Sequence, residues 1–181
     1  MLKRLIDFIR KKMTPIDVQA RKAGVKIGVE NWVSSYFWST EPWLITVGDH
    51  CQITAGVKMV THGGGHVLRD KDPDFDTFGK VTVGSWCYLG TNALIMPGVT
   101  IGDNVLVAAG SVVTKSVPSG MVVGGNPARI LCSIEEYQLR NEKYNLKTKG
   151  LAQDKKREMH ETLPEDKFIV KGYMQQPVRN K

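Results

Sequence analysis

Residues 81–113 read VTVGSWCYLGTNALIMPGVTIGDNVLVAAGSVV, and an aliphatic side chain returns in this stretch at every sixth position. The aliphatic positions are Val83, Leu89, Ile95, Ile101, Val107 and Val113. A period of six fits neither an α-helix, which repeats every ~3.6 residues, nor a long strand, which repeats every ~2. It predicts short strands joined by tight corners, in which three units close one triangular coil around the aliphatic side chains.

Two further columns repeat in step with the aliphatic column. Small or β-branched residues stand two positions before each aliphatic residue, and mostly turn-forming residues, which tolerate a positive φ angle, stand three positions after it. The turn column consists of Trp86, Asn92, Gly98, Asn104, Gly110 and Ser116. Together the columns favour an all-β solenoid over a string of ordinary β-hairpins.

The aliphatic column begins earlier and is interrupted once. The same phase appears at Val47, Ile53 and Met59, and a fainter pair, out of phase, stands at Ile27 and Val33. The next three positions in phase are Gly65, Lys71 and Thr77, which could not line an apolar wall. Residues 62–80 are therefore predicted to leave the coil as an extruded loop, and loops held by a rigid scaffold often carry functional residues.

Composition limits the class of protein. With 181 residues and 41% hydrophobic content, the chain can form one packed core, and it contains no apolar run of the ~18 residues needed to span a bilayer. The start, MLKRLIDFIRKK, does not resemble a signal peptide. Cys51, Cys87 and Cys132 lie far apart, which argues against a disulfide framework and a zinc knuckle. We therefore expect a cytoplasmic protein.

The net charge of +7 predicts an affinity for anions without naming one. The basic residues are scattered and no nucleic-acid-binding motif is present, so we expect no nucleic-acid partner.

Two long segments resemble a known family. The stretch FGKVTVGSWCYLGTNALIMPGVTIGDNVLVAAGSVVTKSVPSGMVVGGNPARIL (78–131) resembles the hexapeptide-repeat acyltransferases, whose fold is a left-handed parallel β-helix. The stretch TEPWLITVGDHCQITAGVKMVTHGGGHVLR (40–69) looks most like the branch that O-acetylates sugars of capsule, lipopolysaccharide or related glycans. The resemblance implies a homotrimer that uses acetyl-CoA as co-substrate, needs no metal, and binds a small-molecule or glycan acceptor between subunits.

His62 is the main catalytic candidate. Taken by position alone, it could be a general base, a zinc ligand or an ordinary loop histidine. Its imidazole suits proton transfer near neutral pH, whereas the other histidines that could complete a zinc site, His50 and His160, stand in a corner and in the distant tail. The resemblance aligns His62 with the family's catalytic base, while we interpret His66 as a bystander.

A base histidine usually has a partner on its second ring nitrogen. Glu41 matches a family position that is often acidic, so the resemblance implies that it orients His62 or grips the acceptor; the alternative is a solvated corner carboxylate. Cys51 and Cys87 are the only plausible covalent nucleophiles, but their place in the small inward column favours buried packing. Direct transfer from the thioester to the acceptor is therefore expected.

The resemblance also implies residues that bind the donor. Tyr88 and Thr91 would lie beside the pantetheine arm, and Ala109 would offer backbone groups to its amides. The adenosine phosphates would be approached by Thr114, Lys115 and Arg129, and the two cationic side chains are natural partners of phosphate. For Lys115, a solvated corner lysine is the alternative.

The ends of the chain are predicted to be helical. Residues 1–22 would form an N-terminal cap over the open end of the coil, and residues 1–12 could instead touch an anionic membrane surface weakly. Residues 23–131 would form the β-helix domain, and the glycine pair at 124–125 predicts an irregular exit from it. Residues 132–181 would form a C-terminal helix and tail, in which SIEE (133–136) opens a helix and a second helix lies near 151–160.

The sequence thus predicts an acetyl-CoA-dependent O-acetyltransferase acting on a sugar or glycan. Two alternatives stay open at this point. One is an N-acetyltransferase of the same fold that acts on an amino-sugar nucleotide or a xenobiotic, and the other is a non-catalytic β-helix scaffold.

Overall fold

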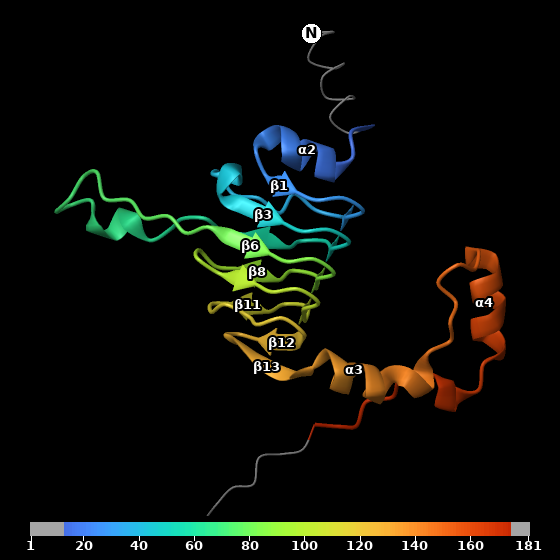
Figure 1. Ribbon diagram of the computed structural model, residues 1–181. Coiled ribbons are helices and arrows are strands. Elements are labelled where there is room, and N and C mark those ends of the chain that lie inside the picture. Colours follow the sequence, from blue (N-terminus) through green and yellow to red (C-terminus); the bar gives the residue numbers. More distant parts are fainter. Residues whose placement is uncertain (1–12, 175–181) are drawn as a thin grey trace, which may run out of the picture. The chain divides into compact units, whose positions relative to one another are not determined.

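A computed structural model of the chain describes residues 13–174 (Figure 1). The predicted N-terminal segment 1–12, with its expected cap or membrane contact, lies outside the described residues. The chain divides into two compact units, with the boundary between Tyr137 and Gln138. Within residues 13–174, no helix is both long enough and apolar enough to cross a membrane.

Short strands of the first unit form three sheets. The four-stranded sheet contains β1 (Lys26–Ile27), β3 (Ile45–Val47), β6 (Val81–Val83) and β9 (Thr100–Ile101). The three-stranded sheet contains β5 (Lys58–Met59), β8 (Leu94–Ile95) and β11 (Val112–Val113). The six-stranded sheet contains β2 (Trp32–Val33), β4 (Gln52–Ile53), β7 (Tyr88–Leu89), β10 (Leu106–Val107), β12 (Met121–Gly125) and β13 (Ala128–Ser133). From β3 to β11 the chain visits the four-, six- and three-stranded sheets in turn, and we call each such passage a coil (Figure 1).

The register of the strands stacks the aliphatic side chains in buried columns. Val47 pairs with Val83 in one sheet, and Met59 pairs with Ile95 in another, all by parallel pairing. These four side chains are at most 2% exposed. The six-residue spacing therefore becomes the hydrophobic core, because each repeat places one aliphatic residue against its equivalents in the coils above and below.

The pair Ile27 and Val33, out of phase in the sequence, belongs to the same core. Ile27 pairs with Val47 and Val33 with Ile53. The phase is lost because residues 34–44 replace a short corner, and Phe37 within them is fully buried with its carbonyl accepting a hydrogen bond from Met59 N–H. This segment ends in the 3₁₀ helix η1 (Pro42–Leu44).

The corners use the left-handed region of φ, as the turn column predicts. Trp86 and Asn92 both have φ of 59°, Asn104 has 54°, and Gly98 and Gly110 are also positive. Ser116 is the exception, and its hydroxyl instead accepts a hydrogen bond from Thr100 N–H of the preceding coil.

The predicted loop leaves the coils between β5 and β6. His62 and Phe78 form an antiparallel bridge at its neck, and Gly79 N–H donates to Thr61 O at 2.8 Å. Beyond the neck the loop contains the 3₁₀ helix η2 (Gly65–Leu68) and projects as the green arm of Figure 1.

The chain leaves the parallel coils at Gly124 and Gly125 in an antiparallel hairpin. β12 and β13 pair with a register shift between Val122 and Val123, and Gly125 is paired to Ala128. Gly125, at φ 101°, allows the chain to reverse there, which a residue with a side chain would do under strain.

Helices flank the coils in the sequence. α2 (Ile16–Ala23) precedes β1 and buries Ala20. α3 (Ile134–Asn141) begins at the predicted capping box, in which Glu136 N–H donates to Ser133 Oγ and Ser133 N–H donates to Glu136 Oε2. The second unit contains η3 (Glu142–Tyr144), α4 (Gln153–Thr162) and η4 (Glu165–Lys167).

Candidate active site

His62 and Glu41 meet at the edge where the three-stranded sheet turns into the four-stranded sheet. His62 lies three residues after β5, and Glu41 immediately precedes η1. The Nδ1 atom of His62 lies 2.6 Å from Glu41 Oε2. Because a carboxylate only accepts, Nδ1 carries the proton, so Nε2 keeps its lone pair in the neutral imidazole. The two residues lie 21 positions apart in the sequence, and the fold brings them together.

Thr61 is a third member of this cluster that sequence reasoning missed. Its buried hydroxyl donates to Glu41 Oε2 at 2.6 Å, so one carboxylate oxygen accepts from both Thr61 and His62. Thr40 Oγ1 also lies 3.3 Å from His62 Nδ1. The available signal was its position: Thr61 lies two residues after the buried Met59, so its polar side chain also points inward.

These hydrogen bonds keep Glu41 ionised. The bond from Thr61 has the largest effect on the pKa of Glu41, and together with His62 it outweighs partial burial and lowers this pKa from 4.5 to about 2. The His62 side chain is 38% exposed and that of Glu41 is 16% exposed. A fixed carboxylate therefore holds an imidazole whose outer part is accessible to a substrate, which suits a general base.

The other histidines lie elsewhere in the fold. His50 stacks on Trp86 at a different edge of the coils, His66 is exposed in η2, and His160 belongs to α4 in the second unit. Among residues 13–174, no cluster of three histidine, cysteine or acidic side chains is arranged to hold a metal ion.

Cys51 and Cys87 are buried neighbours, as the inward column predicts. The Cys51 thiol donates to Gly84 O and the Cys87 thiol to Gly102 O. The hydrogen bond to Cys51, followed by burial, raises the pKa of the Cys87 thiol. Cys87 is thus a poor nucleophile.

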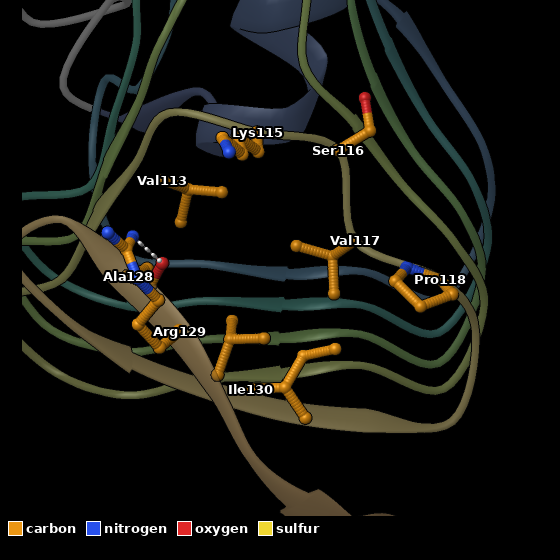
Figure 2. Close-up of a pocket in the computed structure, with 9 residues that line it drawn as sticks. Val113, Lys115, Ser116, Val117, Pro118, Ala128, Arg129 and Ile130 are labelled. Carbon is orange, nitrogen blue, oxygen red and sulfur yellow. Dashed lines mark hydrogen bonds between the residues drawn. The ribbon is translucent and has the colours of Figure 1, made fainter.

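Two of the predicted donor-binding residues line one pocket. Lys115 follows β11 and Arg129 lies in β13, and both contribute to a pocket of about 380 Å³ at the last coil (Figure 2). Val113 and Val117 point into it, whereas Ser116 points away (Figure 2). Lys115 lies at the same edge of the coils as His62 but two coils further along. At the spacing of neighbouring strands, two coils correspond to a separation of ~10 Å.

Three of the remaining donor-binding candidates, Tyr88, Thr91 and Ala109, lie on other sides of the coils. Tyr88 is on the outer face of the six-stranded sheet and is 38% exposed. Thr91 and Ala109 lie at the corner between the six- and three-stranded sheets, where Gly110 N–H donates to Thr91 O. Thr114 is exposed directly after β11. One chain therefore does not gather all the predicted residues around His62.

Comparisons with known proteins agree with the repeat pattern. A family model described as the hexapeptide repeat of succinyl-transferase matches residues 80–115. The chain is 51% identical over 155 residues to the putative acetyltransferase YvoF of Bacillus subtilis, covering 76% of this chain and 86% of that protein. This chain belongs to the hexapeptide-repeat acetyltransferases.

Two further comparisons concern which branch of the acetyltransferases the chain resembles. It is 34% identical over 116 residues to the galactoside O-acetyltransferase of Escherichia coli, covering 63% of this chain and 56% of that protein. It also superposes on a hexapeptide-repeat acetyltransferase of Vibrio cholerae solved in complex with acetyl-CoA, with a TM-score of 0.51 and 28% identity, covering 63% of this chain and 73% of that one. Among hexapeptide-repeat acetyltransferases, the relatives support the branch that O-acetylates sugars, as the sequence predicts.

Proposed function

We propose that this enzyme transfers the acetyl group of acetyl-CoA to a hydroxyl group of a sugar or glycan, with His62 as general base. The observation that carries the proposal is the 2.6 Å contact between His62 Nδ1 and the ionised Glu41 carboxylate. The acceptor class is supported by the galactoside O-acetyltransferase relative, and the donor by the Vibrio cholerae acetyltransferase that binds acetyl-CoA.

The chemistry follows from this pair. His62 Nε2 takes the proton of the acceptor hydroxyl as its oxygen attacks the thioester carbonyl, and the negative carboxylate of Glu41 stabilises the imidazolium that forms. The tetrahedral intermediate then expels the CoA thiolate, which takes the proton back from His62. No protein nucleophile is needed, which agrees with the burial of both cysteines in the inward column.

The donor would be held by more than one copy of the chain. Lys115 and Arg129 would bind its phosphates, with Thr114 beside them, while Tyr88, Thr91 and Ala109 of a neighbouring copy would contact the pantetheine arm. This assignment accounts for the separation of these residues within one chain. We also propose, from the family resemblance, that the enzyme is a cytoplasmic homotrimer of left-handed β-helices, with residues 23–131 as the β-helix domain.

A matched pair of histidine variants tests the proposal. His62→Asn is expected to lower kcat at least ~100-fold, because a positioned general base contributes roughly that factor or more. His66 is an exposed loop histidine, so His66→Asn should keep wild-type activity.

The assay would follow release of the free thiol of CoA, with galactosides, neutral oligosaccharides, amino sugars and amine-containing drugs as acceptors. Unchanged turnover in His62→Asn would exclude this base, and turnover with amines alone would show an N-acetyltransferase.

A further inference from the structure

Phe78 is an exposed aromatic residue beside His62 that the proposed reaction leaves without a role. The two rings have centroids 5.9 Å apart, and their planes are tilted by 59°. Phe78 is 56% exposed, and the side chain of His62 is 38% exposed. The rings therefore border the same open surface, and an acceptor whose hydroxyl reaches His62 arrives next to Phe78.

Backbone pairing holds Phe78 in this place. His62 and Phe78 form the antiparallel bridge at the neck of the loop, where the green arm leaves the coils in Figure 1. Residues that face each other in an antiparallel pair project their side chains from the same side of the sheet. The hydrogen bond from Gly79 N–H to Thr61 O, at 2.8 Å, closes the pair beside them. The position of the Phe78 ring is thus set before any ligand binds, which lowers the entropic cost of using it for binding.

Packing does not account for an aromatic residue at this position. The loop has a second phenylalanine, Phe75, which is partly buried and whose Cδ1 atom would lie 3.5 Å from a Cβ atom on Gly65. Phe78 instead leaves more than half of its surface in water, and so forgoes much of the stabilisation that burial of a phenyl ring gives. An exposed apolar ring beside a reactive histidine is typical of a ligand-binding surface.

The chemistry of this surface fits a pyranose ring. The face of a phenyl ring carries partial negative charge, which attracts the C–H groups on the apolar face of a sugar, while the sugar's hydroxyls project from its rim. Because the imidazole is tilted by 59° to the phenyl ring, a sugar stacked on Phe78 would turn its rim toward His62. We propose that Phe78 binds the acceptor by stacking and selects pyranosides with an open C–H face. The inference rests on the proposed function and narrows its substrate class.

Steady-state kinetics of the full-length enzyme test this role, with the methyl pyranosides of galactose, glucose, mannose and N-acetylglucosamine as acceptors. With the best acceptor of this set, Phe78→Ala should raise the KM for the sugar about tenfold through loss of the stacking surface. The KM for acetyl-CoA and kcat should stay nearly unchanged, because the ring binds the sugar without taking part in proton transfer.

Matched variants separate aromatic stacking from apolar bulk. Phe78→Leu keeps an apolar side chain at the neck of the loop but lacks the aromatic face, so its KM for the sugar should also rise. Phe78→Tyr keeps the ring and should bind the sugar nearly as the wild type does. Val67→Ala shortens an apolar side chain that is 76% exposed elsewhere on the same loop, and its KM for the sugar should equal that of the wild type.

The proposal is wrong if the KM for the sugar is unchanged in Phe78→Ala or normal in Phe78→Leu, or if the KM for acetyl-CoA rises equally, which would place the donor on the ring. Saturation-transfer NMR of the same methyl pyranosides separates this proposal from the proposed function. His62→Asn should lose turnover and still show saturation transfer to the sugar, whereas Phe78→Ala should lose most of that signal. Absence of saturation transfer to every sugar in the wild type would overturn the stacking role. Sugar binding without acetylation in the wild type would overturn the function alone, and the NMR signal of Phe78→Ala would then decide the role of the ring.

Discussion

Glu41 Oε2 accepts two hydrogen bonds of 2.6 Å, one from Thr61 and one from His62. The hydrogen bond from the buried Thr61 fixes the position of the Glu41 carboxylate. The carboxylate in turn fixes the orientation of the His62 imidazole through the second hydrogen bond. In the proposed reaction, Thr61 is therefore a positioning residue, which acts through Glu41. Its importance depends on the short distance and on its complete burial, because water cannot replace the lost donor there.

At this scale we predict that Thr61→Val lowers kcat about tenfold with little change in the KM for acetyl-CoA, because the carboxylate loses its fixed partner and His62 its orientation. Steady-state kinetics over pH 6–9 would measure the effect. Thr61→Ser keeps the hydroxyl and should restore most of the rate. Equal loss in both variants would show that the methyl group's packing matters instead.

The same substitution should change how stability depends on pH. The lowered pKa of Glu41 stabilises the folded state above about pH 4.5, and this contribution is lost as pH falls through about 2. Thr61→Val removes the largest cause and raises the pKa toward 4.5. The Tm difference between wild type and variant should thus be largest near neutral pH and shrink between pH 4.5 and 2, as followed by circular dichroism.

The residues of the site could be predicted only in part. His62 stands out in the sequence because it ends a coil strand where the aliphatic column breaks, and Glu41 was expected through the family resemblance. Thr61 was not predicted, because nothing in the sequence shows that a carboxylate 20 positions away faces its hydroxyl. The stacking of His50 on Trp86 was also not predicted: both turn positions were, but contact between side chains of neighbouring coils depends on the register of the strands.

At the scale of the elements, the coil was predictable because its signal is periodic. Each six-residue unit repeats an inward aliphatic residue and a corner, so one local rule gives many strands. The β12–β13 hairpin was not, because its antiparallel pairing breaks that rule and its two strands share no repeat. The segment 34–44 was missed for the same reason: it buries Phe37 outside the period.

The close stacking of the coils gives a prediction for Gly84. A Cβ atom on Gly84 would lie 2.7 Å from Gly102 C and 2.8 Å from Asp103 N of the next coil, where backbone cannot easily move. Gly84→Ala should therefore lower the free energy of unfolding by about 1–3 kcal/mol, as overpacking does. Urea denaturation would measure it, with Gly150→Ala as control, since nothing lies within 4 Å of a Cβ there. Equal free energies of unfolding for Gly84→Ala and Gly150→Ala would show that the coils accommodate the added methyl group without loss of stability.

At the scale of the whole molecule, the important fact is that the proposed site residues lie on different sides of the coils. His62 and Lys115 share one edge, whereas Tyr88 lies on the outer face of the six-stranded sheet. A single donor molecule can contact both groups if His62 of one copy and Tyr88 of its neighbour face the same groove. In each such site, His62→Asn would remove the residue that one copy supplies, and Tyr88→Ala would remove the residue that its neighbour supplies.

Mixing the two inactive variants should consequently restore activity. If subunits of His62→Asn and Tyr88→Ala are unfolded together in equal amounts and refolded, about one quarter of the sites in a cyclic oligomer receive an intact His62 from one copy and an intact Tyr88 from the next. We expect about that fraction of wild-type kcat per site, compared with the sum of the separately refolded variants as control. Activity no greater than this sum would show that His62 and Tyr88 of the same chain serve one site, or that Tyr88 does not contact the donor.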